Sequence, residues 1–73
     1  MFEYKYFNES DQLVFDGYEE NENLALHMAH VKICNLYEEI DPYYIFFIYD
    51  VDKNTYYVET YSVGLGYLKI IEC

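Results

Sequence analysis

The feature that most constrains the fold is an unbroken run of seven apolar or aromatic residues, 43–49, in a chain of only 73 residues. A strand that is apolar on both faces needs neighbouring elements to cover both faces. A chain of this length buries only ~60% of its unfolded surface, so covering material is scarce. The run therefore raises the question of which surface stays exposed.

The pattern of the whole chain predicts an α+β fold. Alternating residues at 2–7, a turn at 8–11 and a strand from Leu13 to Gly17 indicate an opening hairpin. A helix of ~16 residues begins near Asn21 or Asn23 and ends at the Asp-Pro pair 41–42. Strands at 43–50, 55–61 and 67–72 follow, with turns at 51–54 and 64–66. We expect a single compact domain, 1–73, in which an antiparallel sheet of about five strands, in the order β-β-α-β-β-β, packs on one amphipathic helix.

The helical periodicity predicts which residues of this helix face the sheet. At 100° per residue, one face carries only apolar or aromatic side chains, and polar residues lie off it. The predicted core-facing residues are Ala25, Leu26, Ala29, Ile33, Leu36, Tyr37 and Ile40.

The two central strands are predicted to have one covered and one uncovered face. If Asp50 pairs with Thr55, the inner face carries Ile45, Phe47, Tyr49, Tyr56 and Val58. A single helix can cover only that face, so the outer one is a predicted partner or dimer interface. Its residues are Tyr44, Phe46, Ile48, Tyr57, Glu59 and Tyr61. An incorrect register, or termini folded over this face, remains the alternative.

The charge balance predicts the kind of partner. Fourteen Asp and Glu oppose four Lys and no Arg, giving a net charge of −10. Such a chain repels nucleic acids and anionic membranes, so we expect a protein partner with a basic surface and no direct nucleic-acid or membrane binding. The alternative is an ordinary solvated acidic surface. The candidate partner-binding residues are Asp16, Glu19, Glu20 and Glu22 near the helix start, Glu38, Glu39 and Asp41 near its end, and Asp50 and Asp52 on the next hairpin.

Metal and catalytic signals are weak. His27, His30 and Cys34 lie on one helical stripe and are weak zinc candidates, but no second ligand pair follows, and boundary side chains beside the core are the simpler interpretation. The sequence has no glycine-rich phosphate loop and no nucleophile in a recognisable setting, so we predict neither an enzyme nor a cofactor. It also has no signal peptide and no bilayer-length apolar run, so we expect a cytoplasmic protein.

In size, acidity, lack of Arg and lack of catalytic motifs, the chain resembles small phage-encoded inhibitors of host defence, such as anti-restriction and anti-CRISPR proteins and other nucleic-acid mimics. The resemblance implies an inhibitor that blocks a basic, nucleic-acid-handling host protein as a DNA or RNA mimic. It is a resemblance of composition and assigns no residue roles. Two other hypotheses remain open: an antitoxin-like or regulatory subunit that binds one partner through the aromatic face, and a homodimer.

Overall fold

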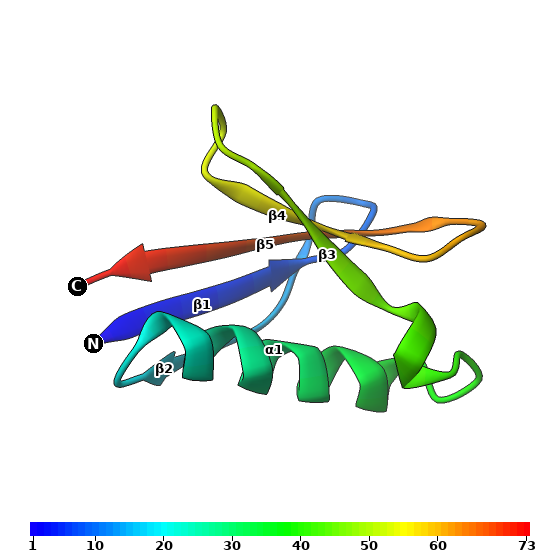
Figure 1. Cartoon of the computed structure of the whole chain (residues 1–73), viewed down its shortest axis with the longest axis horizontal. Helices are drawn as coiled ribbons and strands as arrows, with labels where there is room; N and C mark the ends of the chain where they lie inside the picture. The colour runs from blue at the N-terminus through cyan, green and yellow to red at the C-terminus, as the bar shows by residue number, and fades with distance from the viewer.

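In the computed structural model of residues 1–73, a five-stranded antiparallel sheet packs on one helix (Figure 1). The strands lie in the order β2-β1-β5-β4-β3, with β5 between the first and second hairpins. The α+β class and the chain order of the elements are confirmed. The elements are β1 (Phe2–Phe7), β2 (Leu13–Glu19), α1 (Glu22–Leu36), the 3₁₀ helix η1 (Pro42–Tyr44), β3 (Phe46–Asp50), β4 (Thr55–Glu59) and β5 (Gly64–Glu72).

The β3–β4 hairpin has the predicted register. Asp50 pairs with Thr55, and Phe46 lies opposite Glu59. The turn is held by Asp50, whose Oδ1 accepts hydrogen bonds from the backbone N–H groups of Asp52 (3.0 Å) and Lys53 (3.2 Å). Asn54 adopts the positive φ of 49° that such a turn needs. Local pairing in this hairpin is therefore determined by nearby residues.

Three predicted element bounds around the hairpin are wrong. The strand predicted at 55–61 ends at Glu59. The chain after Pro42 forms η1 before β3 begins at Phe46, because Asp41 caps this short helix by accepting the Tyr43 N–H (2.9 Å). The predicted turn at 64–66 lies inside β5, and the actual turn comes earlier. Gly66 has a φ of 109° at the bulge in β5, where a Cβ would collide with the Phe7 carbonyl.

The helix α1 begins at the predicted cap and ends earlier than predicted. Asn21 Oδ1 accepts the Leu24 N–H (2.9 Å), which satisfies one free donor of the first turn. The helix ends at Leu36 rather than at the Asp-Pro pair. Leu36 is 51% exposed, so its assignment to the core face is wrong. The chain leaves the helix at Tyr37, which turns its ring to the core instead.

Buried tyrosines connect the helix end to the middle of the sheet. The side chain of Tyr6 is fully buried, and its hydroxyl donates to the Leu65 carbonyl and lies 2.8 Å from the Tyr37 hydroxyl. Burial and the neighbouring Tyr37 raise the pKa of Tyr6 far above its ordinary value. The remaining buried apolar residues are Tyr4, Ala25, Ala29, Ile33, Ile45, Val58, Leu65, Leu68 and Ile70.

The helix covers only part of the inner sheet face. It packs against β1, β2 and β5, whereas the β3–β4 hairpin rises away from it (Figure 1). Sheet twist accumulates from strand to strand, so the far hairpin rotates out of reach of a single helix. Ile45 and Val58 are buried as predicted, but Tyr49 is 46% exposed, which corrects its placement under the helix.

The buried Tyr6 hydroxyl gives a stability prediction. Tyr6→Phe should lower the free energy of unfolding by about 1–3 kcal/mol, because the Leu65 carbonyl and the Tyr37 hydroxyl lose their buried partner. Urea unfolding followed by circular dichroism measures the change. Tyr43→Phe, at an 85% exposed ring, is the matched control and should change nothing. An unaltered Tyr6→Phe midpoint would contradict this account of the core.

The raised Tyr6 pKa also gives a pH prediction. The unfolded chain ionises this phenol near its ordinary pKa of 10.0, whereas the folded chain holds its proton. The folded state therefore binds more protons above that pH, so stability is fully present below about pH 10 and falls as the pH rises further. Urea midpoints measured between about pH 8 and pH 11 should decline in the native chain. They should decline less steeply in Tyr6→Phe, and equal slopes would refute the assignment.

Candidate functional site

A solvent-open hollow of about 470 Å³ brings acidic and aromatic side chains together. Glu39, Ile40 and Asp41 come from the connection between α1 and η1, and Tyr44 comes from the end of η1. The opposite wall is the β4–β5 turn, residues 60–63. We call this the acidic hollow; its lining residues are Glu39, Ile40, Asp41, Tyr44, Thr60, Tyr61, Ser62 and Val63.

Local hydrogen bonds fix both walls of the acidic hollow. Asp41 holds η1 through its side chain, and its carbonyl accepts the Tyr44 N–H (2.8 Å). On the other wall, Thr60 Oγ1 donates to the Val63 carbonyl (2.9 Å) and accepts the N–H groups of Ser62 (3.3 Å) and Val63 (3.0 Å). Side-chain bonds of this kind replace the backbone pairing that a turn lacks. The hollow is thus bounded by two ordered turns.

A ladder of four aromatic rings runs along the same end of the molecule. The ring centroids of Tyr43 and Tyr44 are 5.7 Å apart, those of Tyr44 and Tyr61 are 5.7 Å apart, and those of Phe46 and Tyr61 are 5.5 Å apart. These distances fall in the favourable range for edge and tilted pairs. Tyr61 is 82% exposed, so the ladder offers ring faces to solvent.

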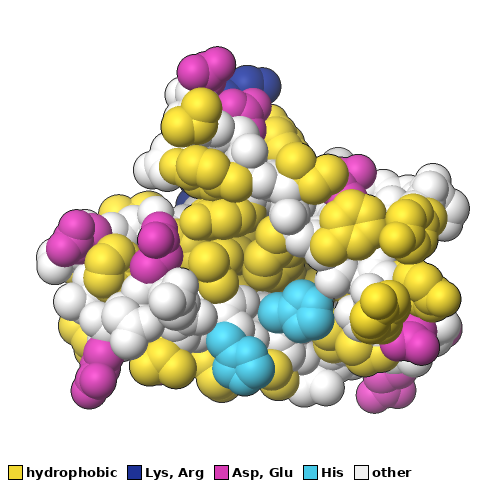
Figure 2. All heavy atoms as spheres, viewed as in Figure 1, with side chains coloured by type: hydrophobic (Ala, Val, Ile, Leu, Met, Phe, Trp, Pro, Cys, Tyr) yellow, Lys and Arg dark blue, Asp and Glu magenta, His cyan; other side chains and the backbone are white.

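The acidic hollow has the chemistry to hold a Lys or Arg side chain. The carboxylates of Glu39 and Asp41 can accept charged hydrogen bonds from an ammonium or a guanidinium group. The faces of Tyr44 and Tyr61 can hold the same cation through cation–π attraction, which strengthens as water is excluded. Figure 2 shows hydrophobic side chains with Asp and Glu beside them at the end of the molecule where the α1–η1 connection and the β4–β5 turn meet.

The predicted acidic residues fall at three places. Glu38, Glu39 and Asp41 are exposed and adjoin the aromatic ladder. Asp50 and Asp52 lie on the β3–β4 hairpin. The third set, Asp16, Glu19, Glu20 and Glu22, lies on β2 and at the start of α1, at the opposite end of the helix.

The predicted aromatic face is formed as expected on β3 and β4 and remains uncovered at several positions. Ile48 lies opposite Tyr57, and Phe46 opposite Glu59. Ile48 is 51% exposed, while Phe46, Tyr57 and Glu59 are half-buried. The termini do not remove this exposure. Tyr44 and Tyr61, which were predicted to lie on the two strands, lie instead in η1 and in the β4–β5 turn, where both line the acidic hollow.

The histidine and cysteine stripe has structural contacts. His30 Nε2 lies 2.9 Å from the Ile45 carbonyl, so this nitrogen carries the proton and donates. The His30 and Phe47 rings form a T-shaped pair with centroids 5.6 Å apart, and Cys34 Sγ lies 3.7 Å from His30 Nδ1. Burial raises the pKa of the Cys34 thiol. His27 is exposed, and no three His, Cys, Asp or Glu side chains converge on a metal-sized site.

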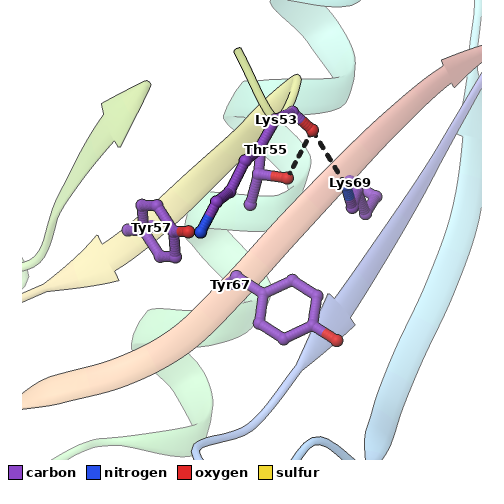
Figure 3. Close-up of a pocket in the computed structure, with 5 residues that line it drawn as sticks. All are labelled: Lys53, Thr55, Tyr57, Tyr67 and Lys69. Carbon is purple, nitrogen blue, oxygen red and sulfur yellow. Dashed lines mark hydrogen bonds between the residues drawn. The ribbon is translucent and has the colours of Figure 1, made fainter. Parts of the chain in front are cut away.

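Sequence reasoning missed a second hollow, on the outer sheet face. It is lined by Lys53, Thr55, Tyr57, Tyr67 and Lys69 and encloses about 480 Å³ (Figure 3). We call it the basic hollow. It depends on β5 lying next to β4, which places Tyr67 opposite Tyr57. The sequence held one signal for this hollow: Tyr67 and Lys69 alternate with Leu68 and Ile70 along a predicted strand, which places both on the same sheet face.

Comparisons with protein-family models, with curated proteins and with solved structures found no match to this chain. No helix of the structure is both long and apolar enough to cross a bilayer.

The position of the aromatic ladder gives a prediction about stability. Tyr61→Ala should change the free energy of unfolding by about 1 kcal/mol or less, because the ring is exposed and loses only ring–ring contacts. Ile45→Ala, at a buried position just beyond the ladder, should cost about 2–5 kcal/mol. Thermal unfolding of both variants measures the difference. A large loss for Tyr61→Ala would mean that the ladder is part of the core.

Proposed function

We propose that this protein is a non-enzymatic binding protein that inhibits a larger target by occupying its basic surface. The observation that carries the proposal is the meeting of Glu39 and Asp41 with Tyr44 and Tyr61 in one exposed hollow. Carboxylates alone give steering and weak surface pairs, whereas aromatic rings beside them supply contact area that can make binding tight.

The net charge supports the same proposal at longer range. A charge of −10 attracts a basic protein before contact and raises the association rate at low salt. Acidic residues at both ends of the 15-residue helix α1 are separated by about 22 Å along its axis. Carboxylates spread over this length could occupy several positions of a groove that normally holds a phosphate backbone.

The charge arrangement also supports a proposal about the class of target. Extended basic grooves belong to proteins that handle nucleic acids. We therefore propose a nucleic-acid-handling host defence protein as the target and a phage as the source, in keeping with the compositional resemblance to anti-restriction and anti-CRISPR inhibitors. In this proposal the protein acts in the cytoplasm of the host cell and mimics DNA or RNA.

A second candidate is an antitoxin-like or regulatory subunit that caps one protein partner. The exposed side chains of Tyr43, Ile48 and Tyr61 favour it, since exposed apolar surface of this kind is typical of protein interfaces. In that case the apolar contacts dominate and the carboxylates contribute little. The salt dependence of binding distinguishes the two candidates, because salt weakens charge-based binding far more than apolar binding.

The test uses the whole protein as an immobilised bait for a bacterial lysate, with elution by salt from about 0.1 M to about 1 M, where the screening length falls from about 10 to about 3 Å. A basic nucleic-acid-handling protein should be retained and released as salt rises. Glu39→Gln with Asp41→Asn should weaken its binding about tenfold or more. Asn at position 41 can still cap η1 through its side-chain oxygen.

The matched control replaces Glu9 and Glu72 by Gln, which also removes two negative charges, but at exposed positions that do not line the acidic hollow. This control should bind nearly as well as the native chain. Equal weakening by both pairs would mean that total charge matters and the hollow does not. A partner that resists high salt and is lost with Tyr61→Ala would support the antitoxin-like candidate instead.

A further inference from the structure

The lysines of this acidic chain are concentrated on one sheet face. Of the four lysines in the chain, Lys5, Lys53 and Lys69 lie on the outer face of β1, the β3–β4 turn and β5. Lys32, on α1, lies instead over the rings of Tyr4 and Phe15. The acidic surface thus has one basic region, and it coincides with the basic hollow.

Two of these three lysines, Lys53 and Lys69, lack an acidic partner, although the chain has fourteen acidic residues. The one ion pair of the structure joins Lys5 to Glu3 at 4.0 Å, so neither Lys53 nor Lys69 has a carboxylate oxygen within that distance. Lys5 lies directly opposite Lys69 across β1 and β5, and like charges in this position repel. An anion bound at Lys69 in the basic hollow would reduce this repulsion.

Hydrogen bonds hold the lysine wall of the basic hollow. The ammonium group of Lys69 donates to the Lys53 carbonyl (3.1 Å), and Thr55 Oγ1 donates to the same oxygen (2.9 Å). Figure 3 shows both bonds meeting at this carbonyl. The Lys69 ammonium keeps further protons for a ligand, because an ammonium group has three.

Two tyrosines form the remaining lining of the basic hollow. Tyr57 and Tyr67 lie opposite each other on β4 and β5, and Phe7 stacks on the Tyr67 ring with centroids 4.9 Å apart. The Tyr67 hydroxyl donates to Asp11, so this ring is held from two sides. This bond raises the pKa of Tyr67 above its ordinary value. Fixed aromatic rings beside cationic groups are the combination that binds bases and phosphates of nucleotides.

We propose that the basic hollow binds a mononucleotide, with its phosphate on Lys53 and Lys69 and its base against Tyr57 and Tyr67. The volume of about 480 Å³ lies within the range of small-molecule sites, ~300–1,000 Å³. A mononucleotide is short enough to stay within the basic region, whereas a longer strand would meet the surrounding carboxylates. At physiological salt, charges beyond about 8 Å are largely screened, so the nearby charges, namely the lysines and the Asp11 carboxylate beside Tyr67, determine the local potential more than the net charge does.

The test is an NMR titration of the isotope-labelled whole protein with adenosine monophosphate, adenosine and inorganic phosphate in turn. Adenosine monophosphate should give saturable shifts at residues 53–57 and 67–69, and should bind at least about tenfold more tightly than either fragment. Equal binding by phosphate alone would overturn the proposal, since the rings would then contribute nothing. Equal binding by adenosine alone, or an absence of saturable shifts, would also overturn it.

The double substitution Lys53→Gln with Lys69→Gln should weaken nucleotide binding about tenfold or more while preserving the fold. Lys32→Gln is the single-charge control on the helix and should leave nucleotide affinity unchanged. Amide spectra report folding of each variant, and Lys69→Gln alone gives a second reading if the double variant unfolds. Unchanged affinity in a folded lysine variant would exclude this site. The basic-partner binding through the acidic hollow should persist in these variants, so the two proposals fail independently.

Discussion

The structure depends on one constraint: a single 15-residue helix cannot cover a twisted sheet of five strands. The helix covers β1, β2 and β5, and the small side chains of Ala25 and Ala29 let it approach them closely. The β3–β4 hairpin twists beyond its reach, so its aromatic residues stay partly exposed (Figure 2). No other element of these 73 residues packs on them, and we propose that this exposed surface is available for binding.

The charged residues are separated by sign on the exposed surface. Carboxylates gather at the two ends of α1 and on the hairpin turn, while three of the four lysines lie on the outer sheet face. The two hollows therefore have opposite chemistry. One pairs Glu39 and Asp41 with tyrosine rings and suits a cation, and the other pairs Lys53 and Lys69 with tyrosine rings and suits an anion. Tyrosine serves both, because its ring packs on apolar neighbours while its hydroxyl reaches water.

Local patterns predicted local structure well. The Asp50–Thr55 register and the outer position of Glu59 followed from a short turn, and the Asn21 cap from its side chain. What the sequence left open depended on contacts distant in sequence. The position of β5 between β1 and β4, which brings Lys69 beside Lys5 and Tyr67 beside Tyr57, is a choice among strand orders that no single strand encodes. The prediction of a strand directly after Asp41 was wrong for a local reason. The Asp41 side chain caps the short helix η1, and the residues after Pro42 form that helix instead of a strand.

The central claim is that the acidic hollow is the surface that receives a basic partner. The most direct measurement is an amide-shift map of the labelled protein titrated with a short arginine-rich peptide. The account predicts saturable amide shifts concentrated at residues 39–44 and 60–63. The signals of Tyr44 and Tyr61 should shift over the same range of peptide concentration. Shifts spread evenly over all acidic residues, or confined to residues 16–22 at the other end of α1, would contradict it.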